Sequence, residues 1–355
     1  MPRPILVTGG AGFIGSHVAK ALAIAGYRPV VYDNLSRGHR WTAKWGPLEA
    51  GDIADGPALR AALQRHRIEA VMHLAAYAYV GESMHAPRAY FRNNLVGSLT
   101  LLDEMLDAGV KSIVFSSTCA TFGLPHRLPI PDDHPQQPVN PYGESKLAVE
   151  RALRWYGEAH GLAWVALRYF NAAGADPDGE LGEDHDPETH LVPLSIQTAL
   201  GQRPCVDVYG TDYATPDGTA IRDYIHVSDL ADAHVRALGY LFQGGASTAF
   251  NLGTGRGYSV REVIREVEEV GDTRVPVRNV PRRPGDVPML VAEATRAASV
   301  LGWRPRRSDL NTMVTTAWLW HSGRRAEGAA PRGLARPAEH TPDGPAALVG
   351  RAFGW

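Results

Sequence analysis

The chain has 355 residues, with 36 lysines and arginines against 38 aspartates and glutamates, so its formal net charge is only −2. A chain of this length forms one large domain or two, and its balanced charge provides no field that would favour nucleic acid or a lipid surface as a partner. Two cysteines are too few for a disulfide framework or a multi-cysteine metal site, which is typical of a reducing compartment. We therefore expect a small-molecule partner.

The start of the chain and its apolar segments indicate neither export nor membrane insertion. Residues 1–7 lead directly into a strand-like segment, without the ordered basic, apolar and cleavage regions of a signal peptide. Apolar runs have the length of core strands and do not reach the roughly 18 residues that span a bilayer. We predict a cytoplasmic protein that binds neither membranes nor nucleic acid.

The first 120 residues alternate short apolar segments with longer segments of helical periodicity. Strands are predicted at residues 5–8, 29–32, 70–74 and 112–116, and helices at 13–25 and roughly 87–107, where leucines recur at helical spacing. Such alternation is typical of βαβ units on a parallel sheet that is buried on both faces. The prediction is a doubly wound α/β fold.

The regular alternation ends after Asn171. Residues 174–187 are rich in Gly, Asp, Pro and Glu and predict a long surface loop leading into a second region. Helices are predicted there at 194–200, 227–241 and 259–270, the last with Ser259 as its N-cap. From Gly323 onward the chain is rich in Gly, Ala, Pro and Arg with little periodicity, so a flexible tail is expected over 323–355.

A glycine-rich segment follows the first predicted strand and opens the first predicted helix. Gly9, Gly12 and Gly15 permit a tight turn, a close approach of a pyrophosphate to the backbone, and binding of its oxygens by N–H groups at the helix start. Asp33 ends the next strand, 18 residues after Gly15, where a carboxylate accepts from the ribose hydroxyls of NAD and repels a 2′-phosphate. We predict an NAD site. Arg37 could instead meet a phosphate, and a structural turn beside a surface aspartate would give the same pattern.

Residues 140–146, NPYGESK, predict a helix start with Asn140 as the cap and Pro141 in the first turn. Tyr142 and Lys146 then share one face of the helix. A phenol works as a base near neutrality only if its pKa falls from about 10 to about 7, which requires roughly 4 kcal/mol of stabilisation. Lys146 is insufficient alone, so the positive ring of NAD would supply the rest. Without other motifs, the pair is equally an exposed aromatic beside a solvated lysine.

Three hydroxyl residues close the predicted strand that precedes this helix. Ser116, Ser117 and Thr118 follow an apolar run, about 25 residues before Tyr142. A hydroxyl at this position could orient a substrate oxygen toward the phenol. The same three residues are also compatible with ordinary turn chemistry.

With these motifs in this order, the chain resembles the UDP-glucose 4-epimerase family of the extended short-chain dehydrogenase/reductase superfamily, over about residues 4–320. Further segments that carry the resemblance are 73–83 (HLAAYAYVGES), 93–94 (NN), 168–175 (RYFNAAGA), 222–227 (RDYIHV), 251–255 (NLGTG) and 282–286 (RRPGD). The resemblance implies a Rossmann-type NAD-binding domain over 1–172 and a smaller α/β UDP-sugar domain over 173–322, with chain crossovers between them. It also implies a homodimer.

The resemblance implies a reversible oxidation at the sugar C4. Tyr142 is the base on the 4-hydroxyl, Thr118 is its hydrogen-bonding helper, and Lys146 bridges the nicotinamide ribose. Hydride passes to NAD, the 4-keto sugar turns over in the pocket, and hydride returns to the opposite face. No external redox partner is then needed, and the substrate is anchored mainly through UDP, which does not react.

The resemblance also implies two sets of binding residues. Those expected at the cofactor are Gly9, Gly12, Phe13, Ile14, Gly15, Asp33, Asn34, Leu74, Ala75, Ala76, Asn94, Ser116, Tyr142, Lys146 and Tyr169. Asp52 and Ile53, after a short apolar stretch, are expected beside the adenine unless they form a plain loop. Those expected at the substrate are Thr118, Tyr142, Asn171, His190, Leu191, Val206, Val208, Tyr209, Arg222, Tyr224, Arg283, Asp286 and Leu290. Guanidinium forks suit phosphate oxygens, although Arg222 and Arg283 are also compatible with ordinary surface arginines.

One departure from the family leaves the substrate open. Leu290 stands where the family limits the sugar pocket, often with a large aromatic residue or a small Cys or Ser. A side chain of intermediate volume does not select among sugars, so UDP-N-acetylglucosamine and UDP-glucuronate are alternative substrates for 4-epimerisation.

Three other functions are less well matched. Nucleotide-sugar dehydratases and decarboxylases need acid/base carboxylates directly after Thr118, where this chain has Cys119 and Ala120. A non-catalytic NAD-binding protein would not need an intact Tyr142 and Lys146. The 14 histidines show no metal-ligand spacing and no His/carboxylate cluster, since His185 and His190 fall in an acidic loop, so no metal site is expected.

Overall fold

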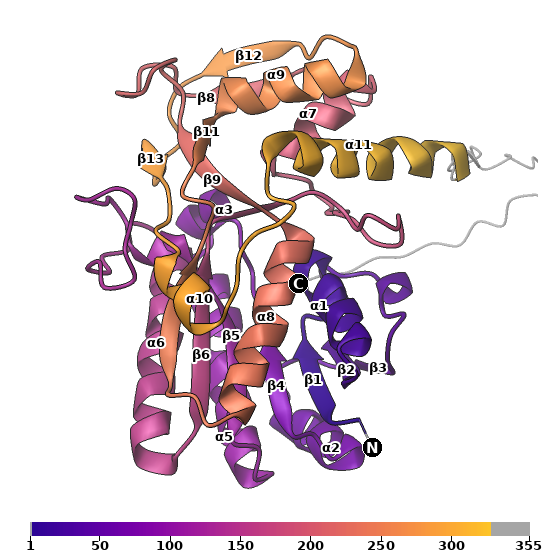
Figure 1. Ribbon diagram of the computed structural model, residues 1–355, viewed down its shortest axis with the longest axis vertical. Coiled ribbons are helices and arrows are strands. Elements are labelled where there is room, and N and C mark those ends of the chain that lie inside the picture. Colours follow the sequence, from indigo (N-terminus) through magenta and orange to yellow (C-terminus); the bar gives the residue numbers. More distant parts are fainter. Residues whose placement is uncertain (1, 328–355) are drawn as a thin grey trace, which may run out of the picture.

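A sheet of seven parallel strands forms the centre of the computed structural model, which describes residues 2–327 (Figure 1). The strand order is β10-β6-β5-β4-β1-β2-β3. The strands are β1 (Pro4–Thr8), β2 (Arg28–Asp33), β3 (Leu48–Ala50), β4 (Ala70–His73), β5 (Ser112–Thr118), β6 (Ala163–Tyr169) and β10 (Thr248–Leu252). The order reverses between β1 and β4, and ligands of such sheets bind at the carboxyl ends of the strands beside this switch point. The predicted doubly wound α/β fold is confirmed.

Helices cover both faces of this sheet. On one face α1 (Phe13–Ile24) packs against α8 (Val227–Phe242), and on the other lie α2 (Gly56–His66), α5 (Gly97–Asp107) and α6 (Pro141–His160). Because side chains alternate along a strand, Ile5 and Val7 enter the first core while Leu6 enters the second. The strands are therefore apolar in continuous runs.

The segment between β4 and β5 is less regular than its leucine spacing suggests. It contains α3 (Val80–His85), α4 (Pro87–Tyr90), a π-helical turn (Phe91–Val96) and then α5. The single helix predicted over 87–107 is thus interrupted. The π-helical turn is where Asn94 directs its amide at the backbone of Tyr77, from which it accepts and to which it donates a hydrogen bond.

A second region is built around β9 (Ile221–His226) and forms the upper part of Figure 1. β9 pairs in parallel with β7 (Asn171–Ala173) and β13 (Met289–Leu290), and in antiparallel with β11 (Gly257–Ser259). Beside it, β8 (Val206–Tyr209) and β12 (Val277–Val280) form a parallel pair. The helices here are α7 (Leu191–Ala199), α9 (Val260–Gly271) and α11 (Leu310–Glu327), with α10 (Thr295–Val300) beside β10.

Two predicted N-caps are confirmed, whereas the helix predicted at 194–200 begins earlier, at Leu191. Asn140 accepts a hydrogen bond from the N–H of Gly143 at 2.8 Å, which caps α6. Ser259 caps α9 in a reciprocal capping box with Glu262, at 3.1 Å and 2.7 Å.

The expected tail begins later than predicted, because α11 continues through residue 323 to Glu327. Its sequence is rich in threonine and other weak helix formers, so periodicity did not indicate it. Met313, Val314 and Ala317 bury against α7 and α9 and stabilise the helix by tertiary packing. Residues 328–355 of the expected tail lie outside the described residues.

Residues 174–190, which we name the crossover loop, include the loop predicted over 174–187, but only part of it, such as residues 177–180, is exposed. Leu181 and Glu183 are buried. Lys20 on α1 ties down the start of the loop, because its Nζ lies 2.8 Å from Asp176, 2.8 Å from Asp178 and 2.7 Å from a carboxylate oxygen of Glu180. The loop therefore packs between α1 and the second region.

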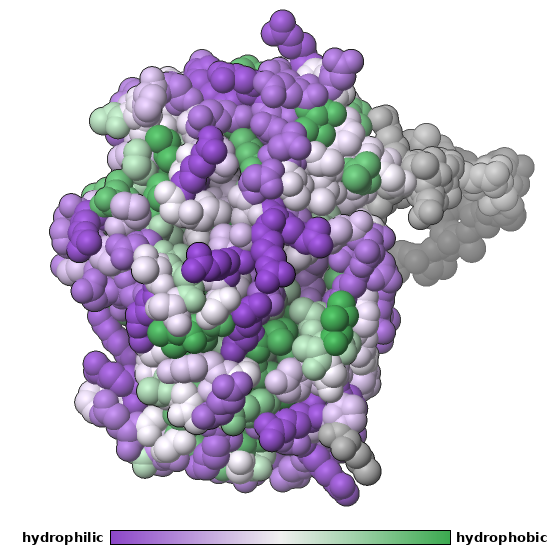
Figure 2. Space-filling model, in the orientation of Figure 1, coloured by the Kyte–Doolittle hydropathy of each residue, from purple (hydrophilic) through white to green (hydrophobic). Residues whose placement is uncertain are grey.

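Figure 2 shows polar residues over much of one face, with apolar residues in separate patches among them. Across residues 2–327, none of the helices combines the length and the apolar character that crossing a bilayer requires. Cys119 and Cys205 are both free thiols.

Four buried histidines predict sensitivity to acid. Burial lowers the pKa of His73 to about 3 and those of His17, His226 and His234 to about 4, from an ordinary value of 6.5. Between pH 6.5 and about 4 the unfolded chain binds protons that the folded chain does not. The stabilisation that comes from keeping these histidines neutral is fully present above pH 6.5. As the pH falls below 6.5, we expect each histidine to lower the free energy of unfolding by about 1.4 kcal/mol per pH unit.

Urea unfolding measured between pH 7 and pH 4.5 tests this expectation. The variant His234→Gln should show a shallower fall of the unfolding free energy with decreasing pH than the parent chain does. A slope identical to that of the parent would show that His234 does not contribute to the acid sensitivity.

Candidate active site

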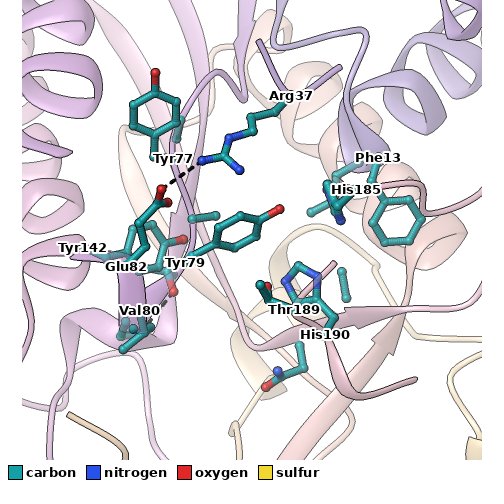
Figure 3. Close-up of a pocket in the computed structure, with 18 of the residues that line it drawn as sticks. Phe13, Arg37, Tyr77, Tyr79, Val80, Glu82, Tyr142, His185, Thr189 and His190 are labelled. Carbon is teal, nitrogen blue, oxygen red and sulfur yellow. Dashed lines mark hydrogen bonds and ion pairs between the residues drawn. The ribbon is translucent and has the colours of Figure 1, made fainter. Parts of the chain in front are cut away.

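A cavity of about 700 Å³ lies between the carboxyl ends of the parallel strands and the region around β9 (Figure 3). Residues at or just after β1, β2, β4, β5 and β6 form one wall, and residues of β7, β8, β9 and β13 contribute to the other. This volume is typical of small-molecule sites. The cavity includes the switch point between β1 and β4, where the sheet topology predicts a ligand.

The glycine loop has room for a ligand only because it lacks side chains. Gly9 has a φ of +69°, and a Cβ there would lie 2.6 Å from the backbone nitrogen of Ala75. A Cβ on Gly15 would lie 2.1 Å from the carbonyl oxygen of Gly9. Gly12 caps α1 without a side-chain hydrogen bond, so the helix start presents backbone N–H groups to the cavity. This cradle fits a pyrophosphate.

The carboxylate of Asp33 is held at the end of β2. Its Oδ2 accepts from the N–H of Ala11 at 2.9 Å and its Oδ1 accepts from the N–H of Leu35 at 2.8 Å. Burial raises its pKa, while these two hydrogen bonds lower it. Asp33 lines the cavity, where its remaining lone pairs can accept from ligand hydroxyls.

Arg37, a possible phosphate partner in the sequence, is engaged elsewhere. Its guanidinium pairs with Glu82 at 2.9 Å and lies 5.7 Å and 5.1 Å from the ring centroids of Tyr77 and Tyr79 (Figure 3). This arrangement ties the loop after β2 to α3 across the cavity. The positive charge of Arg37 is therefore already paired with a carboxylate and in contact with two aromatic rings.

Tyr142 and Lys146 extend from the first turns of α6 into the cavity wall. Burial raises the pKa of Tyr142, whereas a hydrogen bond with Thr118 lowers it. Burial lowers the pKa of Lys146 to about 7, against the opposing effect of Glu150. Lys146 donates a hydrogen bond to the carbonyl oxygen of Ser116 at 2.9 Å. Before a ligand binds, the phenol of Tyr142 is therefore protonated at neutral pH, whereas Lys146 is only partly protonated.

A buried ion pair positions these residues. Arg168 on β6 binds Glu150 on α6 through its Nε at 3.0 Å and its Nη2 at 2.6 Å. Ser117 on β5 donates to the same carboxylate. Both charged side chains are at least nine-tenths buried, so the pair fixes α6 against two strands. Thr118 and Tyr142 are held in register by this network.

The opposite wall carries two arginines. Arg222 on β9 lies beside Leu290 of β13 in the strand register. Arg283 pairs with Asp286 at 3.0 Å and lies 4.9 Å from the ring centroid of Tyr209. Two guanidinium groups on one wall of a cavity suit a ligand with a diphosphate.

The structure brings nearly all the predicted site residues to this one cavity. The predicted catalytic residues Tyr142, Lys146 and Thr118 line it, as do the predicted cofactor residues Gly9, Gly12, Phe13, Ile14, Gly15, Asp33, Asn34, Ile53, Leu74, Ala75, Ala76 and Tyr169. So do the predicted substrate residues Asn171, His190, Leu191, Val206, Tyr209, Arg222, Tyr224, Arg283, Asp286 and Leu290. Asp52, Asn94, Ser116 and Val208 are not part of its lining.

These four residues act behind the wall. Asp52 accepts from the side-chain amide of Asn34 at 2.9 Å, and Asn94 holds the backbone of Tyr77. The Ser116 side chain bonds His234 at 2.8 Å while its carbonyl oxygen anchors Lys146. Val208 packs in the core around α7 and α9. Sequence position places a residue at a strand end but does not say toward which side its polar atoms point.

Sequence reasoning missed other residues of the wall. Tyr77 and Tyr79 line the cavity and lie in segment 73–83, which carries the resemblance. Their spacing of two residues does not by itself identify them as wall residues. The crossover loop contributes Glu183, His185 and Thr189. No local signal marked this loop, because its acidic composition predicts solvent exposure.

The prediction that the histidines form no cluster with carboxylates is wrong. Glu183, His185, Glu188 and His190 each place one ligand atom within 4.8 Å of the others. Because the contacts depend on how an irregular loop folds back on itself, spacing alone did not reveal them.

Comparisons with known proteins agree with this geometry. The model of the NAD dependent epimerase/dehydratase family matches residues 5–253. The chain is 53% identical over 324 residues to the UDP-glucose 4-epimerase of Rhizobium meliloti (strain 1021), covering 91% of this chain and 98% of that protein. The crystal structure of UDP-glucose 4-epimerase from Brucella ovis in complex with NAD is 52% identical with a TM-score of 0.87, covering 89% of this chain and 97% of that one. The Bifidobacterium longum enzyme, in complex with NAD+ and UDP, is 38% identical with a TM-score of 0.86, covering 90% and 98%.

Proposed function

The chain belongs to the NAD dependent epimerase/dehydratase family, and from that membership we propose that it is an NAD-dependent 4-epimerase interconverting UDP-glucose and UDP-galactose. One observation carries the proposal: Tyr142, Lys146 and Thr118 share a single cavity with a glycine cradle and a wall bearing two arginines. The relatives that match over nearly the whole chain bear the same activity in their names.

The residues of the first wall fit NAD. The glycine loop and the start of α1 would hold its pyrophosphate, and Asp33 would accept from its adenosine ribose hydroxyls. The guanidinium of Arg37 also lies on this side of the cavity, but its charge is neutralised by Glu82. It would therefore offer no free cation to a 2′-phosphate on this ribose. Bound in this cradle, NAD supplies the acceptor for the hydride of the sugar C4.

The chain's own residues then handle the proton of the 4-hydroxyl. Tyr142 removes it as C4 is oxidised, and Thr118 orients the hydroxyl by a hydrogen bond. Lys146 would hold the cofactor's ribose and, when protonated, would lower the pKa of the phenol, which burial alone would keep too high. Tyr142 would also hold this proton and return it to the sugar oxygen when the 4-keto group is reduced again.

Anchoring of the substrate falls to the second wall. Arg222 and Arg283 would bind the diphosphate, with Tyr209 beside the base and Asn171 contacting the UDP moiety. Binding concentrated on the unreactive UDP leaves the sugar free to turn over. We assign NAD binding to residues 1–172 and UDP-sugar binding to 173–322, with α8 and β10 crossing back to the large sheet.

A dehydratase function is less well supported. Such a reaction requires an acid or base directly after Thr118, and the residues there are Cys119 and Ala120. Burial raises the pKa of the Cys119 thiol to about 12, so it remains protonated and cannot remove a proton at neutral pH.

The proposal extends to assembly and location. Val96 beside α5 and Trp155 on α6 are 52% and 58% exposed, and these large apolar side chains support a homodimer formed through helices of the NAD-binding region. A nucleotide-sugar substrate and two free thiols support a cytoplasmic location.

A product assay without added reductant tests the activity. Purified protein given UDP-galactose should yield UDP-glucose, read by nucleotide-sugar chromatography, with no build-up of NADH. Parallel incubations with UDP-N-acetylglucosamine and UDP-glucuronate identify the preferred sugar. Stoichiometric NADH together with an oxidised product would instead indicate a dehydrogenase.

A further inference from the structure

Four side chains of the crossover loop converge beside the cavity, outside the catalytic group. Nδ1 of His190 lies 2.7 Å from Glu183 and 3.1 Å from Glu188, and Nδ1 of His185 lies 3.2 Å and 3.6 Å from the same two carboxylates. Four ligands placed about 2.1 Å from one ion at the corners of a tetrahedron are about 3.4 Å apart. The four observed separations, 3.2, 3.6, 2.7 and 3.1 Å, lie on both sides of that value, and the shortest would lengthen on binding an ion.

Two of these atoms lack any other partner. Nδ1 of His185 and Oε2 of Glu188 are buried and make no hydrogen bond, and the side chain of Glu188 is only 4% exposed. Buried polar atoms are almost always satisfied, because an unsatisfied one costs about 1–3 kcal/mol. A cation between the four groups would satisfy both atoms at once.

Without an ion, the two carboxylates are balanced by the two imidazoles: burial lowers the pKa values of His185 and His190, but Glu183 and Glu188 raise them to about 9 and about 10. Glu183 and Glu188 are 5% and 4% exposed and lie on the same two imidazoles, so two carboxylates share one buried space. One divalent ion would neutralise both of them while the imidazoles remain neutral ligands. The loop holds a second cluster, Asp176, Asp178 and Glu180, but there Nζ of Lys20 already occupies the centre.

Neighbouring aromatic rings orient the imidazoles. His185 meets Phe13 edge-on at 6.3 Å between ring centroids and Tyr79 at 6.1 Å, while His190 meets Tyr79 at 5.8 Å. Figure 3 shows His185 next to Phe13, with His190 and Tyr79 also facing the cavity. The backbone N–H of His190 donates to Glu188 at 2.8 Å, which fixes that carboxylate. Ligands held in this way require little rearrangement on binding an ion.

We propose that Glu183, His185, Glu188 and His190 bind one divalent cation through two nitrogens and two oxygens, and that Zn²⁺ matches this set best. The ion clasps the crossover loop against Phe13 at the start of α1, so its role is structural and separate from the hydride transfer. It holds His190 and the adjoining start of α7 at the cavity wall. The inference does not depend on the proposed reaction.

Metal content tests the proposal. Full-length protein without a polyhistidine tag is stripped with a chelator, exposed to Zn²⁺, passed through gel filtration and analysed by elemental mass spectrometry. We expect about one Zn²⁺ per chain, and Co²⁺ in its place should give the visible absorption of a tetrahedral site. His185→Gln and Glu188→Gln should each weaken Zn²⁺ binding by at least about tenfold.

Two controls separate binding from misfolding. His66→Gln removes a histidine that pairs with Glu49 at 2.6 Å, outside the loop, and should leave the metal content unchanged. Glu188→Asp keeps a carboxylate and should retain more metal than Glu188→Gln. Parent protein that folds but takes up no Zn²⁺ or Co²⁺ would overturn the proposal and indicate imidazolium–carboxylate pairs instead. Variants that fold and keep the metal of the parent would overturn it equally. Because both outcomes are read as metal content, neither tests the proposed epimerase activity.

Discussion

Tyr142→Phe is expected to lower the turnover of UDP-galactose by about 10³-fold, while UDP and NAD still bind. The change removes one oxygen from a buried side chain and leaves its ring packing intact. Without the phenol, its neighbours Thr118 and Cys119 do not take its place, because Thr118 is a hydroxyl without a base and Cys119 remains protonated. The proton of the 4-hydroxyl then has no acceptor as the hydride leaves C4.

The measurement is steady-state kinetics together with calorimetric titration of UDP. Tyr240→Phe is a matched control, because it removes a phenol oxygen that bonds only the carbonyl of Ala246 near the end of α8. This control should keep the parent's turnover. Undiminished turnover in Tyr142→Phe would exclude Tyr142 as the base, whereas lost UDP binding would mean that it serves binding.

Gly15→Ala should weaken the binding of NAD by about 100-fold. The new Cβ would lie 2.1 Å from the carbonyl oxygen of Gly9 and 2.8 Å from Cα of Gly10, so the glycine loop must move as a backbone unit. Displacement of a positioning element by about 1 Å costs on the order of 10²-fold. Turnover should fall in parallel, because an enzyme without NAD has no hydride acceptor.

Bound NAD is measured by releasing it from acid-denatured protein and by titrating stripped protein with NAD. Gly239→Ala on α8 provides the comparison, since a Cβ there has no atom within 4 Å. Alanine in a helix interior is favoured over glycine, so this control should bind NAD normally and be slightly more stable. Normal NAD content in Gly15→Ala would show that the loop does not hold the pyrophosphate.

The residues that the sequence correctly places together at the cavity are those whose position is encoded by local spacing. Gly9, Gly12 and Gly15 lie just after β1 and Asp33 ends β2, and parallel strands bring such positions to one edge of the sheet. Tyr142 and Lys146 are four residues apart on a capped helix, which fixes their common face. Chain order and period are sufficient for these assignments.

What spacing could not predict depends on partners distant in the chain. The acidic composition of the crossover loop predicts exposure to solvent. In the structure its acidic start is neutralised by Lys20, which lies 156 residues before Asp176. The sequence predicts Asn94 at the cofactor, whereas the π-helical turn directs its amide at the backbone of Tyr77. α11 has a weak helical pattern and forms because Met313 and Val314 find a core contributed by α7 and α9. In each case tertiary packing decides the outcome.

The return of α8 and β10 to the large sheet has a consequence for any attempt to divide the molecule. β10 hydrogen-bonds along the outer edge of β6, and α8 covers the apolar face shared with α1. A fragment ending at residue 172 would leave that edge open to intermolecular strand pairing and that face wet. We therefore expect a fragment of the first 172 residues to be less stable than the whole chain and prone to associate through its open sheet edge.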